Sequence, residues 1–183
     1  MGVSFEKTPL EGVVLCTVEK YGDPRGFFME TFHAGRYAEG GIDKTFVQDN
    51  FSHSERGVLR GLHYQVNKPQ AKLVSVVHGE IYDVAVDIRK DSKTFGQWYG
   101  ATLSSENQKQ LYVPEGFAHG FCVISERADV SYKCTDLYSA KDERSLLWSD
   151  PSVGIEWPIA EASLSEKDTA APLLQDIKPE DLP

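Results

Sequence analysis

The sequence predicts a mostly β protein, an antiparallel sandwich or barrel with a few short helices. Three observations indicate this class: many short runs rich in β-branched and aromatic residues, glycine-bearing turns between them, and almost no long stretch with helical period. The 183 residues contain no internal repeat, low-complexity tract or linker. A chain of this length can bury a core of its own, so we expect residues 1–183 to form a single domain.

The elements follow one another closely along the chain. Strands are predicted at residues 13–18, 27–32, 45–51, 58–64, 72–77, 80–88, 98–103, 110–113, 120–125 and 129–134. Residues 21–26 form a turn, and His78-Gly79 joins two strands in a tight hairpin. Short helices are expected within 33–41, at 104–107 and from 163–166, and the end at 178–183 is expected to be loosely held.

Composition restricts the classes of partner and compartment. Hydrophobic residues make up 40% and charged residues 26%, which is ordinary for a soluble globular protein. The net charge of −9 disfavours nucleic acid and anionic membranes as partners, so an anionic ligand would need a local cationic pocket. No apolar run is long enough to cross a bilayer, the N-terminus lacks a secretory signal, and Cys16, Cys122 and Cys134 form no CxxC pair. We expect a cytoplasmic protein with buried, reduced thiols.

Strand alternation places two polar side chains on apolar faces. Lys72 shares its face with Val74 and Val76, and Tyr132 shares its face with Val130. Each has an ordinary structural interpretation, as a lysine whose stem lies along apolar surface and as a buried tyrosine with a satisfied hydroxyl. Taken singly, neither residue identifies a site.

Two histidines lie in distinctive surroundings. His63 follows Arg60 at the opposite parity of the strand, so both side chains line one pocket only if Gly61 permits a bulge. His119 is delivered to the start of a strand by a turn that contains proline and glycine. Histidine pairs suggest a transition metal, but there is no His-x-His and no carboxylate at ligand spacing, so we expect no metal.

The chemistry that suits these residues is proton transfer. The chain has no Gly-x-Ser-x-Gly elbow and no phosphate loop of the Walker type. A neutral histidine is a good general base near pH 7, an aspartate orients it, a lysine stabilises an enolate oxygen, and a tyrosine returns a proton from the opposite face. This set can abstract a proton next to a ketone and reprotonate with inversion.

Nine stretches of the sequence together resemble the dTDP-4-dehydrorhamnose 3,5-epimerase family. They run in order from about residue 4 to residue 177 and are GDPRGFF (22–28), QDNFS (48–52), GVLRGLHYQ (57–65), QAKLV (70–74), VPEGFAHGF (113–121), YKCT (132–135), DP (150–151), IEWP (155–158) and LSEKD (164–168). The resemblance implies a cupin-type jelly roll without metal or other cofactor, working as a homodimer. It also implies epimerisation of dTDP-4-dehydro-6-deoxy-D-glucose at C3 and C5 on the way to dTDP-L-rhamnose.

The resemblance also implies roles for individual residues. His63 would be the base, Asp168 its orienting partner, Tyr132 the acid and Lys72 the enolate stabiliser. Residues expected to bind the substrate are Arg25, Phe27, Glu30, Gln48, Asp49, Asn50, Arg60, His119, Tyr138, Glu143 and Lys167. Arg25, Phe27 and Glu30 lie in the segment that such proteins lend to the neighbouring subunit, and Tyr138 matches the position that stacks on thymine. Arg25, Arg60, Lys72 and Lys167 would line the diphosphate pocket.

Three alternatives stay open at this point. A mono-epimerase of the same fold, acting at C3 or C5 only, would use the same residues for abstraction. A non-catalytic sugar-nucleotide binding module would be expected to lose the base or the acid, and this chain keeps both. A metal-dependent cupin oxygenase is disfavoured by the missing ligand spacing.

Overall fold

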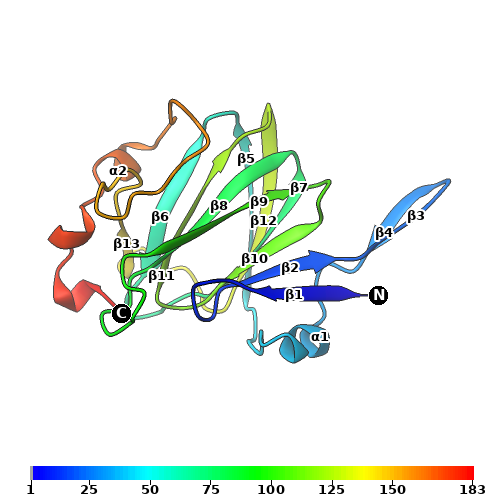
Figure 1. Cartoon of the computed structure of the whole chain (residues 1–183), viewed down its shortest axis with the longest axis horizontal. Coiled ribbons are helices and arrows are strands. Elements are labelled where there is room, and N and C mark those ends of the chain that lie inside the picture. The colour runs from blue at the N-terminus through cyan, green and yellow to red at the C-terminus, as the bar shows by residue number, and fades with distance from the viewer. Residues whose placement is uncertain (1) are drawn as a thin grey trace.

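Two antiparallel sheets face each other in the computed structural model, which describes residues 2–183 (Figure 1). The six-stranded sheet has the order β1 (Val3–Lys7), β2 (Val14–Val18), β10 (Lys109–Val113), β7 (Lys72–His78), β12 (Arg127–Cys134), β5 (Gln48–Glu55). The five-stranded sheet has the order β13 (Glu143–Ser145), β6 (Leu59–Gln65), β11 (Phe117–Val123), β8 (Glu80–Asp87), β9 (Trp98–Ser104). This arrangement confirms the predicted mostly β, jelly-roll class.

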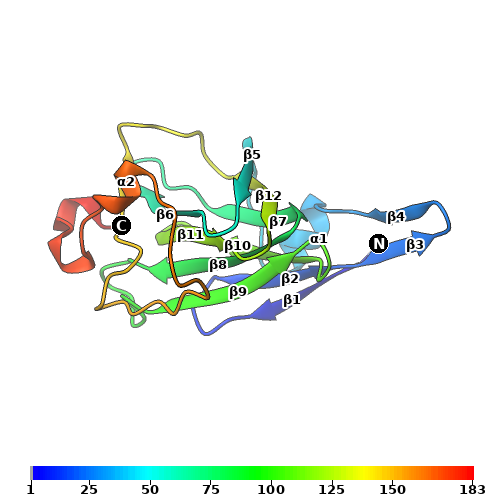
Figure 2. The same cartoon turned by 90° about the horizontal axis from the view of Figure 1, so that it is seen from above.

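A separate hairpin projects from the body of the molecule, as both views show (Figures 1 and 2). It consists of β3 (Lys20–Asp23) and β4 (Gly26–Met29), which pair only with each other. The sequence predicted a turn at 21–26 followed by a strand at 27–32, so the strand assignment was wrong in its bounds. The two strands pair from Lys20 with Met29 to Asp23 with Gly26, so the turn shrinks to Pro24 and Arg25.

The helices are short, as predicted. α1 (Ala34–Glu39) is capped by the His33 ring, which accepts from the Arg36 backbone N–H, and α2 (Glu166–Thr169) is capped by Ser165. Residues 104–107 form a turn and no helix, because Ser104 and Asn107 use their side chains to cap the loop backbone. The strands β1 and β13 were not predicted, since each is short and only partly buried.

Apolar side chains pack in three clusters. The first lies between the two sheets and includes Val74, Ile81, Leu111 and Phe121. The second lies on the outer face of the five-stranded sheet under the C-terminal segment, and the third lies on the outer face of the six-stranded sheet under α1. Cys16, Cys122 and Cys134 are buried free thiols, as expected.

The C-terminal segment is held against the body, contrary to the prediction of a loose end. It contains two short 3-10 helices, η1 (Leu174–Asp176) and η2 (Pro179–Asp181). Lys90 donates from its backbone N–H to the Pro183 carbonyl and from Nζ to the Pro179 carbonyl, and Arg144 Nε lies 2.7 Å from Asp181 Oδ1. The polar composition of the tail does not indicate these contacts, because the partner residues lie far away in the sequence. No helix in residues 2–183 is long and apolar enough to span a membrane.

Candidate active site

His63 and Asp168 meet although 105 residues separate them in the chain. His63 is carried by β6, and Asp168 lies in the first turn of α2, where the Ser165 side chain accepts from its backbone N–H. His63 Nε2 lies 2.5 Å from Asp168 Oδ1, and Asp168 is buried. Burial acts to raise the pKa of Asp168, but the bonds to His63 and Ser165 outweigh it and hold this pKa below its usual range. The carboxylate therefore stays ionised and fixes the imidazole ring.

A bulge in β6 places Arg60 and His63 in the same cavity. His119 of β11 pairs with His63, but Phe121, two residues on, pairs with Arg60, so β6 carries an extra residue there. Gly61 adopts φ +127° at this point and faces the backbone of Gly120 so closely that a Cβ would lie 2.6 Å from its Cα. A side chain at position 61 is thus excluded both by conformation and by contact.

Two adjoining cavities lie beside the His63–Asp168 pair, and both are lined by His63, Lys72 and Tyr132. The larger has a volume of about 420 Å³ and is lined by Ser52, Val58, Leu59, Arg60, His63, Lys72, His119, Phe121, Tyr132, Ser163, Leu164, Ser165 and Asp168. The smaller has a volume of about 240 Å³ and is lined by Gln48, Asn50, His63, Tyr64, Gln65, Gln70, Lys72, Tyr132, Tyr138 and Glu143. Together they form one cleft with the candidate proton-transfer groups at its centre.

Lys72 and Tyr132 come from neighbouring strands of the six-stranded sheet. Tyr132 pairs with Val74 and Cys134 pairs with Lys72 between β12 and β7, so both side chains project toward the facing sheet. Burial lowers the pKa of Lys72 and raises the pKa of Tyr132. The tyrosine is therefore held in its protonated form, which is the form that a general acid requires.

A second histidine–aspartate pair is more deeply buried than the first. His119 Nε2 is 2.9 Å from Asp83 Oδ1, and both residues are buried. Burial lowers the pKa of His119. Asp83 was missed at the sequence level, although an aspartate at the inward parity of the apolar strand 80–88 is the kind of signal that finds such a residue.

Polar side chains at the outer end of the cleft form one connected network. Glu143 Oε2 accepts from the Tyr138 hydroxyl at 2.9 Å and lies 2.6 Å from Lys167 Nζ. Gln48 accepts from the Tyr138 backbone N–H, and its amide donates to Asn50 Oδ1. Burial acts to raise the pKa of Glu143, but the bonds from Lys167 and Tyr138 outweigh it and lower this pKa. Tyr138 keeps an exposed ring, with 55% of its surface accessible.

Four of the predicted site residues are not brought to the cleft of their own chain. Asp49 lies on the outer face of the six-stranded sheet, because it alternates with Gln48 and Asn50 along β5, and it pairs there with Lys133 Nζ at 2.8 Å. Arg25 and Phe27 are exposed on the β3–β4 hairpin, and Glu30, which follows it, forms an ion pair with Arg36.

Several residues that line the cleft were not predicted. They are Ser52, Val58, Leu59, Tyr64, Gln65, Gln70, Phe121, Ser163, Leu164 and Ser165. Ser163 reaches the site through a parallel bridge to Val58, a contact between segments about a hundred residues apart that no local pattern indicates. Within residues 2–183 no group of three or more His, Cys, Asp or Glu side chains is arranged to hold a metal ion.

The model of the dTDP-4-dehydrorhamnose 3,5-epimerase family matches residues 7–176. The chain belongs to this family. It is thus an enzyme of the epimerase class, as the motifs predicted.

Two relatives with the same printed name are matched over different shares of their own length. The dTDP-4-dehydrorhamnose 3,5-epimerase of Methanothermobacter thermautotrophicus is 52% identical over 167 residues, which cover 90% of each chain. The protein of the same name from Neisseria gonorrhoeae is 56% identical over 164 residues, 89% of this chain, and the matched region spans 50% of its length.

A solved epimerase has nearly the same fold. The crystal structure of dTDP-6-deoxy-D-glucose-3,5-epimerase from Legionella pneumophila, in complex with dTDP-4-keto-L-rhamnose, superposes with a TM-score of 0.97. It is 52% identical in sequence, and the match covers 100% of this chain and 98% of that chain.

Proposed function

We propose that this epimerase inverts C3 and C5 of dTDP-4-dehydro-6-deoxy-D-glucose, giving dTDP-4-dehydro-L-rhamnose for dTDP-L-rhamnose synthesis. The observation that carries the proposal is the His63–Asp168 pair, 2.5 Å apart, facing the same cleft as Lys72 and Tyr132. Membership of this family supports a dTDP-sugar as the substrate. The cleft contains the groups that proton transfer next to a ketone requires.

His63 is the base in this proposal. Its Nε2–H donates to Asp168, which leaves the lone pair on Nδ1 free to take a proton from the carbon next to the C4 ketone. The C–H bond breaks, its electron pair moves into the enolate, and negative charge develops on the C4 oxygen. Lys72 stabilises that oxygen as a cation in a partly enclosed site.

Tyr132 is the acid that completes each inversion. Its hydroxyl delivers a proton to the opposite face of the enolate, the C4 ketone is restored, and the tyrosinate is reprotonated from His63 or solvent. Repeating the sequence at the second carbon inverts both centres. Removing a general acid or base usually costs ~10²–10⁴ in rate, so either residue alone is expected to have a large effect.

The outer part of the cleft binds the nucleotide in this proposal. Arg60 lines the larger cavity, and its Nε donates to Ser54 Oγ. In this proposal the guanidinium binds the diphosphate. The exposed Tyr138 ring stacks on thymine, and Gln48, Asn50, Glu143 and Lys167 bond its polar edges and the sugar. Asp49 has no place in this part of the proposal, because it lies on the other face of the sheet.

We further propose that the enzyme is a cytoplasmic homodimer in which residues 1–183 act as one domain and each hairpin completes the partner's site. Support comes from the hairpin, which projects from the body with Phe27 and Phe28 each 62% exposed (Figure 2). Aromatic side chains so exposed are typical of a protein interface. In this arrangement Arg25, Phe27 and Glu30 reach the neighbouring cleft. The free, buried thiols fit a reducing compartment.

Two other functions remain as outcomes of the test. A mono-epimerase of the same fold would place label at one carbon only, and a binding module would show no exchange. The experiment is proton NMR of dTDP-4-dehydro-6-deoxy-D-glucose in D₂O with the protein and without a reductase. Deuterium at both C3 and C5 supports the proposal, and its absence at both, with binding retained, contradicts it. Wild-type exchange by His63→Ala would show that the base is wrongly assigned.

A further inference from the structure

The Gln65 side chain is buried beside the cleft, and every hydrogen-bonding group of its amide is in use. Gln65 is 5% exposed, lies on β6 two residues after His63, and lines the smaller cavity with it. Its Nε2 donates to the Lys68 carbonyl at 2.6 Å and to the Leu137 carbonyl at 3.3 Å. Its Oε1 accepts from the Ser139 backbone N–H at 2.7 Å. An amide so engaged holds one orientation.

Two of these bonds reach the residues on either side of Tyr138. Leu137 and Ser139 bond to the same amide, although 72 and 74 residues separate them from Gln65 in the chain. Residues 137–139 belong to no strand or helix, so regular secondary structure does not fix them. Gln48 adds a third point by accepting from the Tyr138 backbone N–H at 2.8 Å. Side-chain amides therefore hold the backbone before, at and after Tyr138.

The Tyr138 ring depends on these bonds for its position. The residue is 55% exposed, and its hydroxyl donates to Glu143 Oε2 at 2.9 Å. Exposed side chains change rotamer rapidly unless other contacts fix them. A ring that stacks on a base binds more tightly when it is already held in the bound position, because less freedom is lost on binding. The amide that holds the loop can therefore affect the affinity for the nucleotide.

The same amide connects the Tyr138 loop to the strand of the proposed base. β12 belongs to the six-stranded sheet and β13 to the five-stranded sheet, so the loop between them crosses from one sheet to the other. Pairing with β6 fixes β13, where Glu143 lies opposite Gln65 and Ser145 lies opposite His63. Gln65 extends this hold beyond the ladder to residues 137–139. The position of the ring relative to His63 therefore depends on one side chain of β6.

We propose that Gln65 is a positioning residue for nucleotide binding: its amide fixes the Tyr138 ring relative to the strand that carries His63. The stacking of Tyr138 on the base rests on the proposed function. The anchoring of the loop rests on the three hydrogen bonds of the amide. Gln70 supports the loop at an earlier point, where its Nε2 donates to the Asp136 carbonyl at 2.7 Å.

The test is a double-mutant cycle on the affinity for dTDP, measured by calorimetry with the wild type, Gln65→Met, Tyr138→Ala and the double variant. Methionine has the length of glutamine but cannot make the three bonds. Tyr138→Ala removes the stacking ring and should weaken dTDP binding about 5- to 150-fold. Gln65→Met should weaken it about fivefold or more when the ring is present, and less than about twofold in the Tyr138→Ala background.

Two results would overturn the proposal. If Gln65→Met weakened dTDP binding by the same factor in both backgrounds, Gln65 would act independently of the ring, through a direct contact with dTDP or through general stability. If Gln65→Met bound dTDP as the wild type does in both backgrounds, the ring would not need the amide.

The matched control is Asn107→Leu. The Asn107 amide also makes three bonds to backbone groups: its Oδ1 accepts from the N–H groups of Ser104 and Lys109, and its Nδ2 donates to the Thr102 carbonyl. Asn107 lines neither cavity of the cleft. Leucine has the shape of asparagine without these bonds, so Asn107→Leu should lower the unfolding temperature and leave dTDP binding unchanged.

Hydrogen exchange of the Ser139 amide tests the anchoring without a bound nucleotide, and in the wild type without a stable variant. We expect this amide to exchange about 100-fold or more slowly than in an unstructured peptide, because Gln65 holds its N–H. Exchange at the unstructured rate would contradict the proposal. The protection should be lost in Gln65→Met and kept in Asn107→Leu. If the wild type does not bind dTDP, the proposed function fails, while Ser139 exchange still decides whether Gln65 holds the loop.

Discussion

In the proposed mechanism, single side chains in the cleft carry separable chemical steps. His63 is oriented by Asp168 at 2.5 Å, while Tyr132 reaches the cleft from the facing sheet. A base on one sheet and an acid on the other can address the two faces of a planar enolate. Abstraction and inversion are therefore expected to respond differently to substitution.

Replacement of Tyr132 by phenylalanine should separate the two steps. His63 can still remove a proton and return a deuteron to the same face, so label should continue to enter the substrate in D₂O. The inverted product should form ~10²–10⁴ times more slowly, because the opposite face has lost its acid. Proton NMR of the recovered sugar measures both quantities. Loss of exchange and inversion in equal measure would mean that Tyr132 is not the acid.

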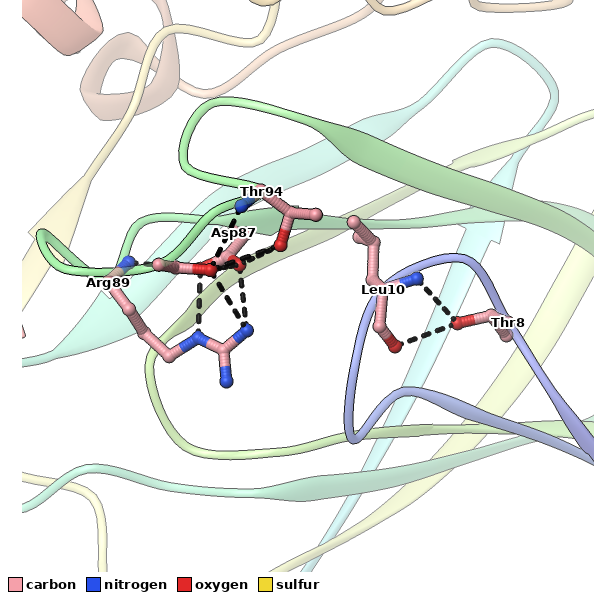
Figure 3. A network of polar contacts seen from close by, with 6 residues as sticks. Thr8, Leu10, Asp87, Arg89 and Thr94 are labelled. Atoms are coloured by element: carbon pink, nitrogen blue, oxygen red, sulfur yellow. Dashed lines mark hydrogen bonds and ion pairs between the residues drawn. The ribbon is translucent and has the colours of Figure 1, made fainter.

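Strand β6 shapes the site through its backbone, whereas the loop after β8 lies outside the cleft and is held by a single carboxylate. In β6 the extra residue around Gly61 turns Arg60 and His63 toward one cavity. Asp87, the last residue of β8, accepts hydrogen bonds from side chains of the loop at residues 89–94. Figure 3 shows its carboxylate at the centre of bonds from Arg89 and Thr94, with the Thr8–Leu10 turn nearby.

The substitution Gly61→Ala should damage both stability and activity. A Cβ would lie 2.6 Å from Gly120 Cα and 2.8 Å from the His119 carbonyl oxygen, and the φ of +127° is unfavourable for alanine. Both neighbours are backbone atoms, so we expect a loss of roughly 2–4 kcal/mol in the free energy of unfolding. Denaturant unfolding measures it. Gly41→Ala is the control, because Gly41 has φ +89° with open space around it and should lose only roughly 1–2 kcal/mol.

The loop at Asp87 gives a pH dependence of stability. Burial acts to raise the pKa of Asp87, but bonds from Arg89, Ser92 and Thr94 outweigh it and lower this pKa from 3.8 to about 2. A carboxyl with a depressed folded pKa stabilises the protein above its unfolded pKa, and that stabilisation is lost as the pH falls through the folded value. Between pH 4 and pH 2 the wild type should lose roughly 2 kcal/mol that Asp87→Asn does not lose.

Denaturant titrations of the wild type and Asp87→Asn across this range measure the difference. The exposed neighbour Asp91, in the same loop, provides the control variant Asp91→Asn, which should follow the wild-type pH profile. Parallel pH profiles for the wild type and Asp87→Asn would show that the Asp87 network does not lower its pKa in the folded state.

The arrangement of the subunits can be tested by complementation. Chains carrying His63→Ala lack the base, and chains carrying Arg25→Ala with Phe27→Ala lack the proposed contribution of the hairpin. Neither should be active alone. After mixing, unfolding and refolding, half of the dimers contain one chain of each kind and have one intact site, so about a quarter of wild-type activity should return. Activity no greater than the sum of the parents would exclude a site shared between subunits.

Local patterns in the chain were enough to predict the antiparallel β class, most of the strands, the buried thiols and the family. Alternation along a strand is set by backbone geometry, so it can be read without knowing the neighbours. The motifs likewise identified His63, Lys72, Tyr132 and Asp168 as candidates. Strand parity required a bulge at Gly61 before Arg60 and His63 could share a pocket, and the structure has a bulge there.

The pairings between distant strands decided the rest. Only the register of β8 against β11 brings Asp83 to His119, and only the packing of α2 on the cleft brings Asp168 to His63 across 105 residues. The same alternation that places Gln48 and Asn50 in the cleft turns Asp49 away from it, and the hairpin leaves Arg25 and Phe27 outside the cleft of their own chain. Such contacts depend on long-range burial and strand order, which local spacing does not encode.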